Sequence, residues 1–340
     1  MKNLRQVLSN IFVLVVLIAF TFLIIFNNFD FNKTIEIVLD AKFSYILISI
    51  LCMSLYYVFE GISIKNVLNK LGDKVSLLKT IKFTYIGFFF SGITPAASGG
   101  QPMEIYYMKK EKIKVNHGAL AMLVHLISYQ IVIIILGIIG FILNKELLGD
   151  SLWIFYAGLS LNLFAFTIMV IGVFYPKFSK KIIAFVIKIM EKFKVKNIDQ
   201  KKERINKAVK EYNEGAKFIK NNYNIFLKSI LMAFLQMVSY YSVVYFVYRS
   251  FGLDSYNYIE MLFIQTMLFI SVSSIPLPGS VGVSETVFLK IYETIFGLEL
   301  LPSAMILNRG INFYLFIFIC TLVVIINNIW LKLKETNQMG

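Results

Sequence analysis

Residues 91–104 read SGITPAASGGQPME, and an apolar stretch that begins at residue 83 leads into them. The segment holds two prolines and three glycines, the residues that break a helix most readily. A second apolar stretch begins at residue 259 and leads into residues 276–285, which read PLPGSVGVSE. From first proline to final glutamate, the two segments have the same length. Both apolar stretches are therefore interrupted before they are long enough to cross a bilayer, which takes about 20 residues.

The composition of the chain excludes a soluble enzyme and a disordered protein. Of the 340 residues, 58% are hydrophobic and 16% are charged, and the mean hydropathy is +0.71. Soluble proteins carry about 25% charged residues, because their surface has to stay in water. The sequence therefore predicts an all-α polytopic membrane protein. About six full spans are expected, over residues 8–26, 43–60, 117–142, 152–175, 225–248 and 304–330.

The distribution of basic residues predicts the sides of the membrane. Lysines gather in residues 65–82 and again in residues 109–114, so both segments are expected in the cytoplasm, together with the N- and C-termini. The apolar stretch between these two segments then has to enter and leave on one side. By the same rule, residues 259–297 begin and end outside. We expect two re-entrant broken helices that enter the bacterial plasma membrane from opposite faces.

The two interrupted segments and their neighbouring spans recur at a nearly constant offset and run in opposite directions. Inverted repeats with broken helices at the midplane are typical of transporters. The predicted fold is thus a single integral membrane domain over residues 1–340, in an inverted-repeat arrangement. Repeat one covers about residues 8–142 and repeat two about residues 152–330. The alternative is that both interrupted segments are surface loops between short ordinary spans.

The two breaks are the predicted substrate site. Non-helical backbone at membrane depth has to be buried in protein or line a wet cavity. Half-helices that begin after each break would point free N–H groups at the midplane, where they can hold an anion. Pro102 suits the first position of one half-helix, and Ser284 suits the N-cap of the other. The candidate substrate-binding residues are Thr94, Pro95, Ser98, Gly99, Gly100, Gln101, Glu104, His125, Pro278, Gly279, Ser280, Gly282, Ser284, Glu285 and Arg309.

Ionisable residues inside spans are costly and usually functional. Glu104, Glu285, Lys290 and Arg309 are the candidates, with Glu60 nearer an interface. Either of the first two glutamates could complement the start of its own helix. Arg309 could pair with Glu285, or it could grip a phosphate through its planar guanidinium. We favour a mixture, in which the ion pair holds Arg309 ready for an anionic headgroup.

The remaining polar residues do not indicate catalysis or metal binding. His125 is expected to be a hydrogen-bonded core histidine, with proton transfer as the alternative. Cys52 and Cys320 both lie in apolar runs, which argues against a disulfide framework. With only His117 and His125 as histidines, no metal site is expected. The sequence therefore predicts no catalytic residue, no metal and no other cofactor.

Residues 176–224 form a strongly basic segment with 14 lysines and arginines. Apolar residues recur between them at helical spacing, which predicts an amphipathic cytoplasmic helix on an anionic membrane surface. A docking surface for a soluble partner is the alternative. Because no nucleic-acid-binding motif is present, no direct nucleic-acid partner is expected.

Residues 88–110, FFFSGITPAASGGQPMEIYYMKK, and residues 276–285 resemble the lysylphosphatidylglycerol synthase/flippase membrane-domain family. The resemblance spans about residues 5–330, with Pro-Gly-Ser at 278–280 where the family pattern usually reads Pro-Gly-Gly. It implies an integral membrane protein that handles phospholipid. In full-length members a cytosolic domain moves lysine from lysyl-tRNA onto phosphatidylglycerol. The membrane part passes the product to the outer leaflet, which gives resistance to cationic antimicrobial peptides.

Two functions remain open at the level of sequence. Because the chain ends shortly after its last expected span, we expect it not to catalyse the lysyl transfer, and a separate cytosolic transferase is a candidate partner. The leading function is translocation of an anionic or aminoacylated phospholipid between leaflets. The alternative is a membrane-embedded transferase, either a phosphatidylglycerol lysyltransferase or an enzyme that uses a prenyl-phosphate-linked donor. Its acid would come from Asp30, Glu36 or Asp40 in the first outside loop, where no Asp-x-Asp pair occurs.

Overall fold

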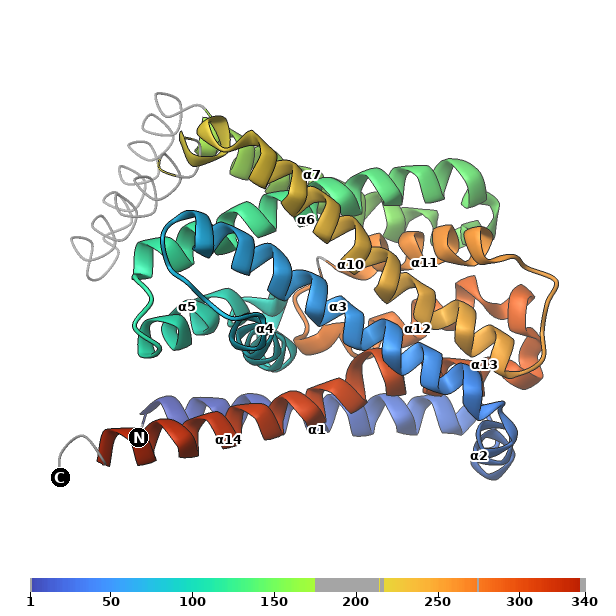
Figure 1. The fold of residues 1–340 in the computed structure, drawn as a ribbon. Coiled ribbons are helices and arrows are strands. Elements are labelled where there is room, and N and C mark those ends of the chain that lie inside the picture. The colour runs from blue at the N-terminus through green and yellow to red at the C-terminus, as the bar shows by residue number, and fades with distance from the viewer. Residues whose placement is uncertain (1, 175–213, 215–216, 274, 337–340) are drawn as a thin grey trace, which may run out of the picture.

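The structure is a computed structural model that describes residues 2–174, 214, 217–273 and 275–336 (Figure 1). Within these residues all regular structure is helical. The α-helices are α1 (Lys2–Asn28), α2 (Phe31–Asp40), α3 (Phe43–Lys70), α4 (Leu77–Gly92), α5 (Gly100–Lys110), α6 (Val115–Asn144), α7 (Leu152–Phe174), α10 (Tyr223–Ser250), α11 (Tyr258–Ser273), α12 (Val283–Ile291), α13 (Glu293–Arg309) and α14 (Phe316–Thr336). Short helical turns η1 (Pro95–Ala97), η2 (Lys145–Ser151) and η3 (Pro278–Ser280) and a π-helical segment η4 (Gly310–Leu315) connect them.

Five helical stretches are long and apolar enough to cross a membrane: α3, α6 with the start of η2, α7, α10, and the continuous run from α13 to α14. Shorter apolar helices cover Ser9–Leu23 within α1 and all of α11. The prediction of an all-α polytopic membrane protein is therefore confirmed. Five of the six expected spans correspond to these stretches, and the expected span at 8–26 corresponds to the shorter apolar helix Ser9–Leu23. Helix α3 runs ten residues beyond the expected end at residue 60. It ends at a turn through Gly72, whose φ of +95° suits a residue without a side chain.

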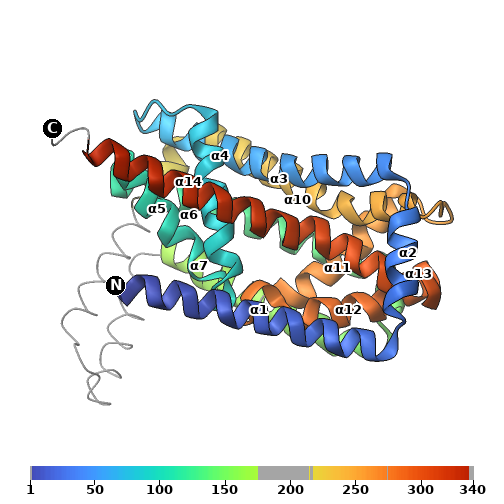
Figure 2. The same cartoon turned by 90° about the horizontal axis from the view of Figure 1, so that it is seen from below.

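Helices α3 and α10 form an antiparallel pair. At one end the backbone N–H of Lys42 donates to the carbonyl of Ser250 at 2.9 Å. Deeper in the protein, the Gln236 amide of α10 donates to the Glu60 carboxylate of α3 at 2.8 Å. The pairing places the first turn of α3 beside the last turn of α10, as the two views agree (Figures 1 and 2).

The first interrupted segment is a hairpin made of α4, η1 and α5. Both of its ends lie at one end of the molecule, which we call the basic end (the loops at residues 71–76 and 111–114). Lys82 near the start of α4 pairs with Glu111 at the end of α5 at 2.6 Å. The imidazole of His117 contacts Asp73 across the two loops at 2.5 Å. The structure therefore agrees with the re-entrant prediction for this segment and not with the alternative of a surface loop between short ordinary spans.

The second interrupted segment is a hairpin made of α11, η3 and α12, and it enters from the opposite end of the molecule. The hydroxyl of Tyr248, in the last turn of α10, accepts a hydrogen bond from the backbone N–H of Tyr256 just before α11. Its ring also packs on Phe296 in α13 at 5.6 Å between centroids. The start of α11 and the α12–α13 junction therefore meet at the end of α10. Figure 1 shows α2 and α13 at this opposite end, and α1 begins and α14 ends at the basic end.

The helix contacts follow an inverted two-fold pattern. The packing of α3 on α4, α4 on α5, and α5 on α6 recurs as α10 on α11, α11 on α12, and α12 on α13. The packing of α14 on α4 likewise recurs as α6 on α11. The turns η1 and η3, at the tips of the two hairpins, contact each other. This correspondence relates α3–α6 to α10–α14. The extension of the repeats to α1 and α7 stays a prediction.

Two expectations about the connections need comment. The expected outside loop at residues 27–42 is mostly the amphipathic helix α2, which Asp30 caps by accepting a hydrogen bond from the backbone of Lys33 at 2.9 Å. Hydropathy could not separate a polar surface helix from a loop. The expected amphipathic segment at 176–224 lies almost wholly outside the described residues, apart from residues 214 and 217–224.

Candidate functional site

A cavity of about 530 Å³ lies between the two hairpin tips. It receives side chains from both halves of the inverted pattern, which explains why no single stretch of sequence contains it. The polar residues that line it, apart from tyrosines, are Glu60, Thr84, Ser91, Ser98, Gln101, Glu104, His125, Gln130, Asn162, Gln265, Ser273, Ser280, Ser284, Asn308, Arg309 and Asn312. Tyrosines and phenylalanines, among them Tyr56, Tyr129, Tyr240 and Phe313, supply much of the apolar wall. The cavity thus combines many polar side chains with an aromatic, apolar wall.

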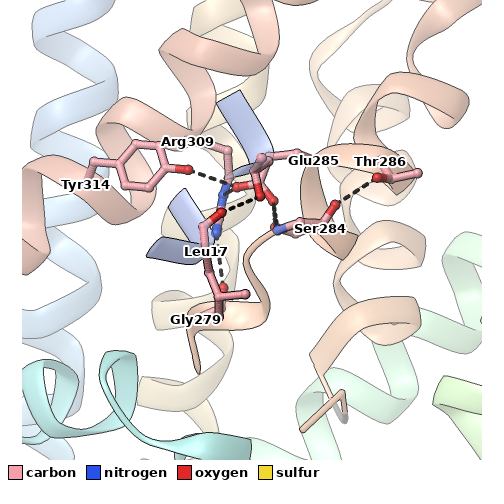
Figure 3. A network of polar contacts seen from close by, with 9 residues as sticks. Leu17, Gly279, Ser284, Glu285, Thr286, Arg309 and Tyr314 are labelled. Atoms are coloured by element: carbon pink, nitrogen blue, oxygen red, sulfur yellow. Dashed lines mark hydrogen bonds and ion pairs between the residues drawn. The ribbon is translucent and has the colours of Figure 1, made fainter. Parts of the chain in front are cut away.

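Glu285 and Arg309 form a buried ion pair beside the second hairpin tip (Figure 3). The Arg309 Nε donates to Glu285 Oε1 at 2.8 Å, and Nη2 donates to the carbonyl of Gly279 at 3.0 Å. The residues are only 1% and 7% exposed. The predicted pairing is therefore confirmed, and we call these residues, with Tyr314, the arginine cluster.

Glu285 also completes the start of its own helix. Its Oε2 accepts from the backbone N–H of Gly282 at 2.7 Å and from the hydroxyl of Ser284 at 3.0 Å. The phenol of Tyr314 donates to Oε1 at 3.0 Å. The two roles considered for this glutamate, helix start and arginine partner, are thus carried by the two oxygens of one carboxylate. Gly282 rather than Ser284 is the N-cap of α12, so the N-cap assigned to Ser284 was wrong.

Arg309 lines the cavity and has N–H donors beyond those used in its two hydrogen bonds to acceptors among the described residues. A guanidinium has five N–H donors, and two bonds to acceptors are present among the described residues. The guanidinium carbon lies 4.7 Å from the ring centroid of Phe313 and 5.7 Å from that of Tyr314. These rings hold the planar group in place through cation–π contacts. The remaining donors suit a second, anionic acceptor.

The backbone at the second tip depends on residues that accept a positive φ. Gly279 has a φ of +58° and Gly282 a φ of +90°. A β-carbon at Gly279 would come within 2.2 Å of the Phe313 ring. Ser280 holds a φ of +51° and is anchored by a hydrogen bond from its hydroxyl to the Val272 carbonyl at 3.1 Å. This is the position at which the resembled pattern has glycine.

A π-helical segment, η4, directly follows Arg309. Segments of this kind are rare and are frequent at functional sites. The amide oxygens of Asn308 and Asn312 are buried and have no partner among the described residues, and both side chains line the cavity. Nothing in the sequence indicated the change in helix type. The segment leaves two polar groups beside Arg309 available to a ligand.

The first hairpin tip is held mainly by its own side chains. The Thr94 hydroxyl donates to the Phe90 carbonyl at 2.6 Å and accepts from the backbone N–H of Gly99 at 2.9 Å. Ser98 donates to the Pro95 carbonyl at 2.8 Å. Helix α5 begins at Gly100, so Pro102 is its third residue and not its first. Of the residues of this tip that were predicted to bind substrate, Ser98 and Gln101 line the cavity, whereas Thr94, Pro95, Gly99 and Gly100 do not.

The second polar group of the cavity is acidic, and we call it the acidic cluster (Glu60, Glu104 and His125). Glu104 is 3% exposed, and its Oε2 has no partner among the described residues. The His125 Nε2 lies 3.8 Å from Glu60 Oε1, and His125 Nδ1 has no partner in the part of the chain that the structure describes. Glu60 lines the cavity because α3 continues past it to Lys70, and its position near a membrane interface stays a prediction.

The cavity contains about half of the predicted substrate-binding residues. Those that line it are Ser98, Gln101, Glu104, His125, Gly279, Ser280, Ser284 and Arg309. Those not among its lining residues are Thr94, Pro95, Gly99, Gly100, Pro278, Gly282 and Glu285. The second set shapes the tips or supports the first set. Whether either set binds substrate stays a prediction.

Sequence reasoning missed a third polar group in the wall. The Gln130 amide donates to the side-chain oxygen of Asn162 at 2.9 Å, and the Asn162 amide donates to the Ser273 hydroxyl at 3.0 Å. These residues link α6, α7 and the end of α11. Amides within apolar spans were a usable signal, since a buried amide needs partners.

Other candidates lie away from the cavity. Lys290 is exposed near the end of α12 and is not among the residues that line the cavity. Glu36 and Asp40 are exposed on α2, where Asp30 serves as the N-cap, so these acids do not converge on a pocket with the cavity residues. Within the described ranges no group of three or more His, Cys, Asp or Glu residues could hold a metal.

The comparisons with known proteins agree with this architecture. The family model for the lysylphosphatidylglycerol synthase TM region matches residues 7–320. The chain is 21% identical to a UPF0104 membrane protein of Pyrococcus horikoshii, over 84% of this chain and 87% of the relative. It is also 21% identical to a UPF0104 membrane protein of Archaeoglobus fulgidus, over 87% of this chain and 90% of the relative. Because the family model covers most of the chain, the protein belongs to the family of the lysylphosphatidylglycerol synthase TM region.

Proposed function

We propose that this protein translocates an anionic or aminoacylated phospholipid, of the lysylphosphatidylglycerol type, between the leaflets of a membrane. The headgroup enters the cavity between the hairpin tips, and the acyl chains stay in the bilayer. The observation that carries the proposal is the position of Arg309. Arg309 is the only arginine or lysine among the described residues that line the cavity. Its guanidinium has N–H donors beyond the two that bond to acceptors in the described part of the chain.

The chemistry around Arg309 fits a phosphate diester next to hydroxyl groups. Guanidinium groups bind phosphate oxygens through two parallel hydrogen bonds. The unpartnered amide oxygens of Asn308 and Asn312 are acceptors at the same place, which suits the hydroxyls of a glycerol or the ammonium of an aminoacyl group. Glu285 compensates the charge of Arg309 when the cavity is empty, so no isolated cation has to be buried.

The inverted hairpins supply a route between leaflets. The two tips contact each other, and each hairpin opens toward a different end of the molecule. Transporters built on inverted repeats expose a central site to one side at a time by moving one repeat against the other. The same proposal places the basic end on the cytoplasmic side of a bacterial plasma membrane, against anionic lipid. A separate cytosolic transferase would supply aminoacylated lipid there.

Reconstitution tests the function. We reconstitute purified protein in phosphatidylcholine vesicles with a trace of fluorescent phosphatidylglycerol and add a membrane-impermeant quencher. Translocation should bring inner-leaflet label to the outer leaflet, so that nearly all of the fluorescence is quenched. Arg309→Lys keeps the charge but loses the planar fork, so we expect translocation to fall at least about tenfold, or about 1.4 kcal/mol of interaction. Lys290→Arg, on the exposed end of α12, is the control and should leave the rate unchanged. Translocation by Arg309→Lys at the wild-type rate would contradict the phosphate role.

A further inference from the structure

The acidic cluster has no role in the phosphate site, and its geometry calls for a ligand of its own. Glu104 projects from α5 and Glu60 from α3, and both carboxylates line the same cavity beside α4, which contacts α3 through the bond from Thr84 to the Tyr57 carbonyl. Glu104 packs so tightly on α4 that a β-carbon at Gly87 would collide with its carboxylate. The fold thus leaves space at Gly87 for this carboxylate, and the side chain lines the cavity.

The protein provides too few donors for two carboxylates. Gln236 donates to Glu60 Oε2, whereas Glu104 Oε2 has no partner among the described residues. The other titratable groups facing the pair are Tyr56 on α3, His125 and Tyr129 on α6, and Tyr240 on α10, while α4 faces it with Thr84 and Gly87. Within the described part of the chain, no lysine or arginine forms an ion pair with either carboxylate.

Two neighbouring buried carboxylates without a cation cannot both stay ionised at low cost. Burying an unpaired carboxylate is strongly unfavourable, and a second negative charge nearby adds to that cost. Pairs of this kind resolve the conflict by sharing a proton, so that one carboxyl group is neutral. A cavity of about 530 Å³ has room for the water that carries the proton in and out.

We propose that Glu60 and Glu104 form a proton-binding site in the cavity, and that the proton they hold is coupled to lipid translocation. The coupling part rests on the proposed function. In the step itself, a hydronium ion on one side transfers its proton to a carboxylate oxygen, which leaves water and a neutral carboxylic acid. When the cavity faces the other side, the new O–H bond breaks and the proton returns to a water molecule there. His125, with Nδ1 unpartnered and Nε2 3.8 Å from Glu60, lies where it can pass the proton.

Infrared spectroscopy of the purified full chain tests the proton site without any lipid cargo. Wild-type protein at neutral pH should show the absorption of a protonated carboxyl group, distinct from that of carboxylates. Glu104→Gln should remove this band, because the amide has the same shape and carries no acidic proton. Glu146→Gln, an exposed glutamate outside the cavity, should leave it in place. A wild-type spectrum without the band would overturn the site.

A pH gradient across reconstituted vesicles tests the coupling. One pH unit can sustain up to about a tenfold difference in fluorescent phosphatidylglycerol between leaflets for each proton exchanged. We expect this asymmetry in wild type and in Glu146→Gln, and equal leaflets in both Glu104→Gln and Glu60→Gln. Wild-type protein that translocates lipid but fills both leaflets equally would overturn the coupling and leave the proposed function standing. Wild-type protein that moves no lipid would refute the proposed function and the coupling together, and the infrared result still decides the proton site.

Discussion

Glu285 shows how one residue links the sequence to the site. Its position three residues after Gly282 lets one oxygen accept from the free N–H at the start of α12. The other oxygen is then directed at Arg309. The pairing was predictable, because a lone arginine at membrane depth costs at least about 2.5–3.5 kcal/mol and so requires a partner. The second role of Glu285, as an acceptor for the backbone N–H of Gly282, was not predictable, because it depends on where α12 begins.

Replacing Glu285 by Gln should destabilise the protein strongly. The change leaves Arg309 as an unpaired buried charge and places an N–H₂ group where an acceptor was. Removing one partner of a buried pair costs about 3–5 kcal/mol. Thermal unfolding in detergent should show the loss, whereas Glu299→Gln, which breaks an exposed pair with Lys33, should have little effect. Equal stability of the two variants would contradict the buried ion pair.

Gly279 and Gly72 separate backbone strain from contact. Both have a positive φ, of +58° and +95°, and Gly72 is the left-handed residue that closes the end of α3, so an alanine at either position should cost about 1–2 kcal/mol for the left-handed backbone. The new methyl group meets the Phe313 ring in Gly279→Ala and meets nothing within 4 Å in Gly72→Ala. We therefore expect Gly279→Ala to unfold at a clearly lower temperature. Matching unfolding temperatures would mean that the second tip does not press on Phe313.

At the scale of elements, the hairpins were predictable and their boundaries were not. Basic segments on both flanks of residues 83–102 required a re-entrant path, and the structure has one. Helix α3 was cut short in the prediction because Lys65 and Lys70 lower the hydropathy of its last turns. Glu60, at the expected end of that span, was therefore not among the predicted substrate-binding residues, although it lines the cavity. The π-helical turn at Gly310–Leu315 left no signal, since its cause is packing around Arg309 and not local sequence.

The hairpin paths predict which loops share a side of the membrane. Lys74→Cys and Lys114→Cys lie in the two loops of the basic end, where Asp73 of the first loop contacts His117 in the first turn of α6, just after the second loop. A membrane-impermeant thiol reagent should label both from the same side. Asp254→Cys, in the loop before α11, should be labelled from the other side. Labelling of positions 74 and 114 from opposite sides would refute the first hairpin.

For the whole molecule, the sequence was sufficient for the class and for the inversion, because both follow from hydropathy, charge and the paired motifs. The cavity could not be predicted in the same way. Its wall combines α3, α6, α10 and both hairpins, so residues such as Gln236 and Asn162 become neighbours of the site only through packing. Pairs of residues this far apart in the chain are set by the fold, and one sequence does not reveal them.

Blocking the cavity while translocation is recorded tests the central claim most directly. Gln101→Cys places a thiol in the cavity wall on α5, and Tyr106→Cys places one on the same helix at an exposed residue outside that wall. In vesicles with fluorescent phosphatidylglycerol, a bulky thiol reagent should stop translocation by Gln101→Cys and leave Tyr106→Cys and the wild type, with its native Cys52 and Cys320, active. Undiminished translocation by fully modified Gln101→Cys would show that the lipid headgroup does not pass through this cavity.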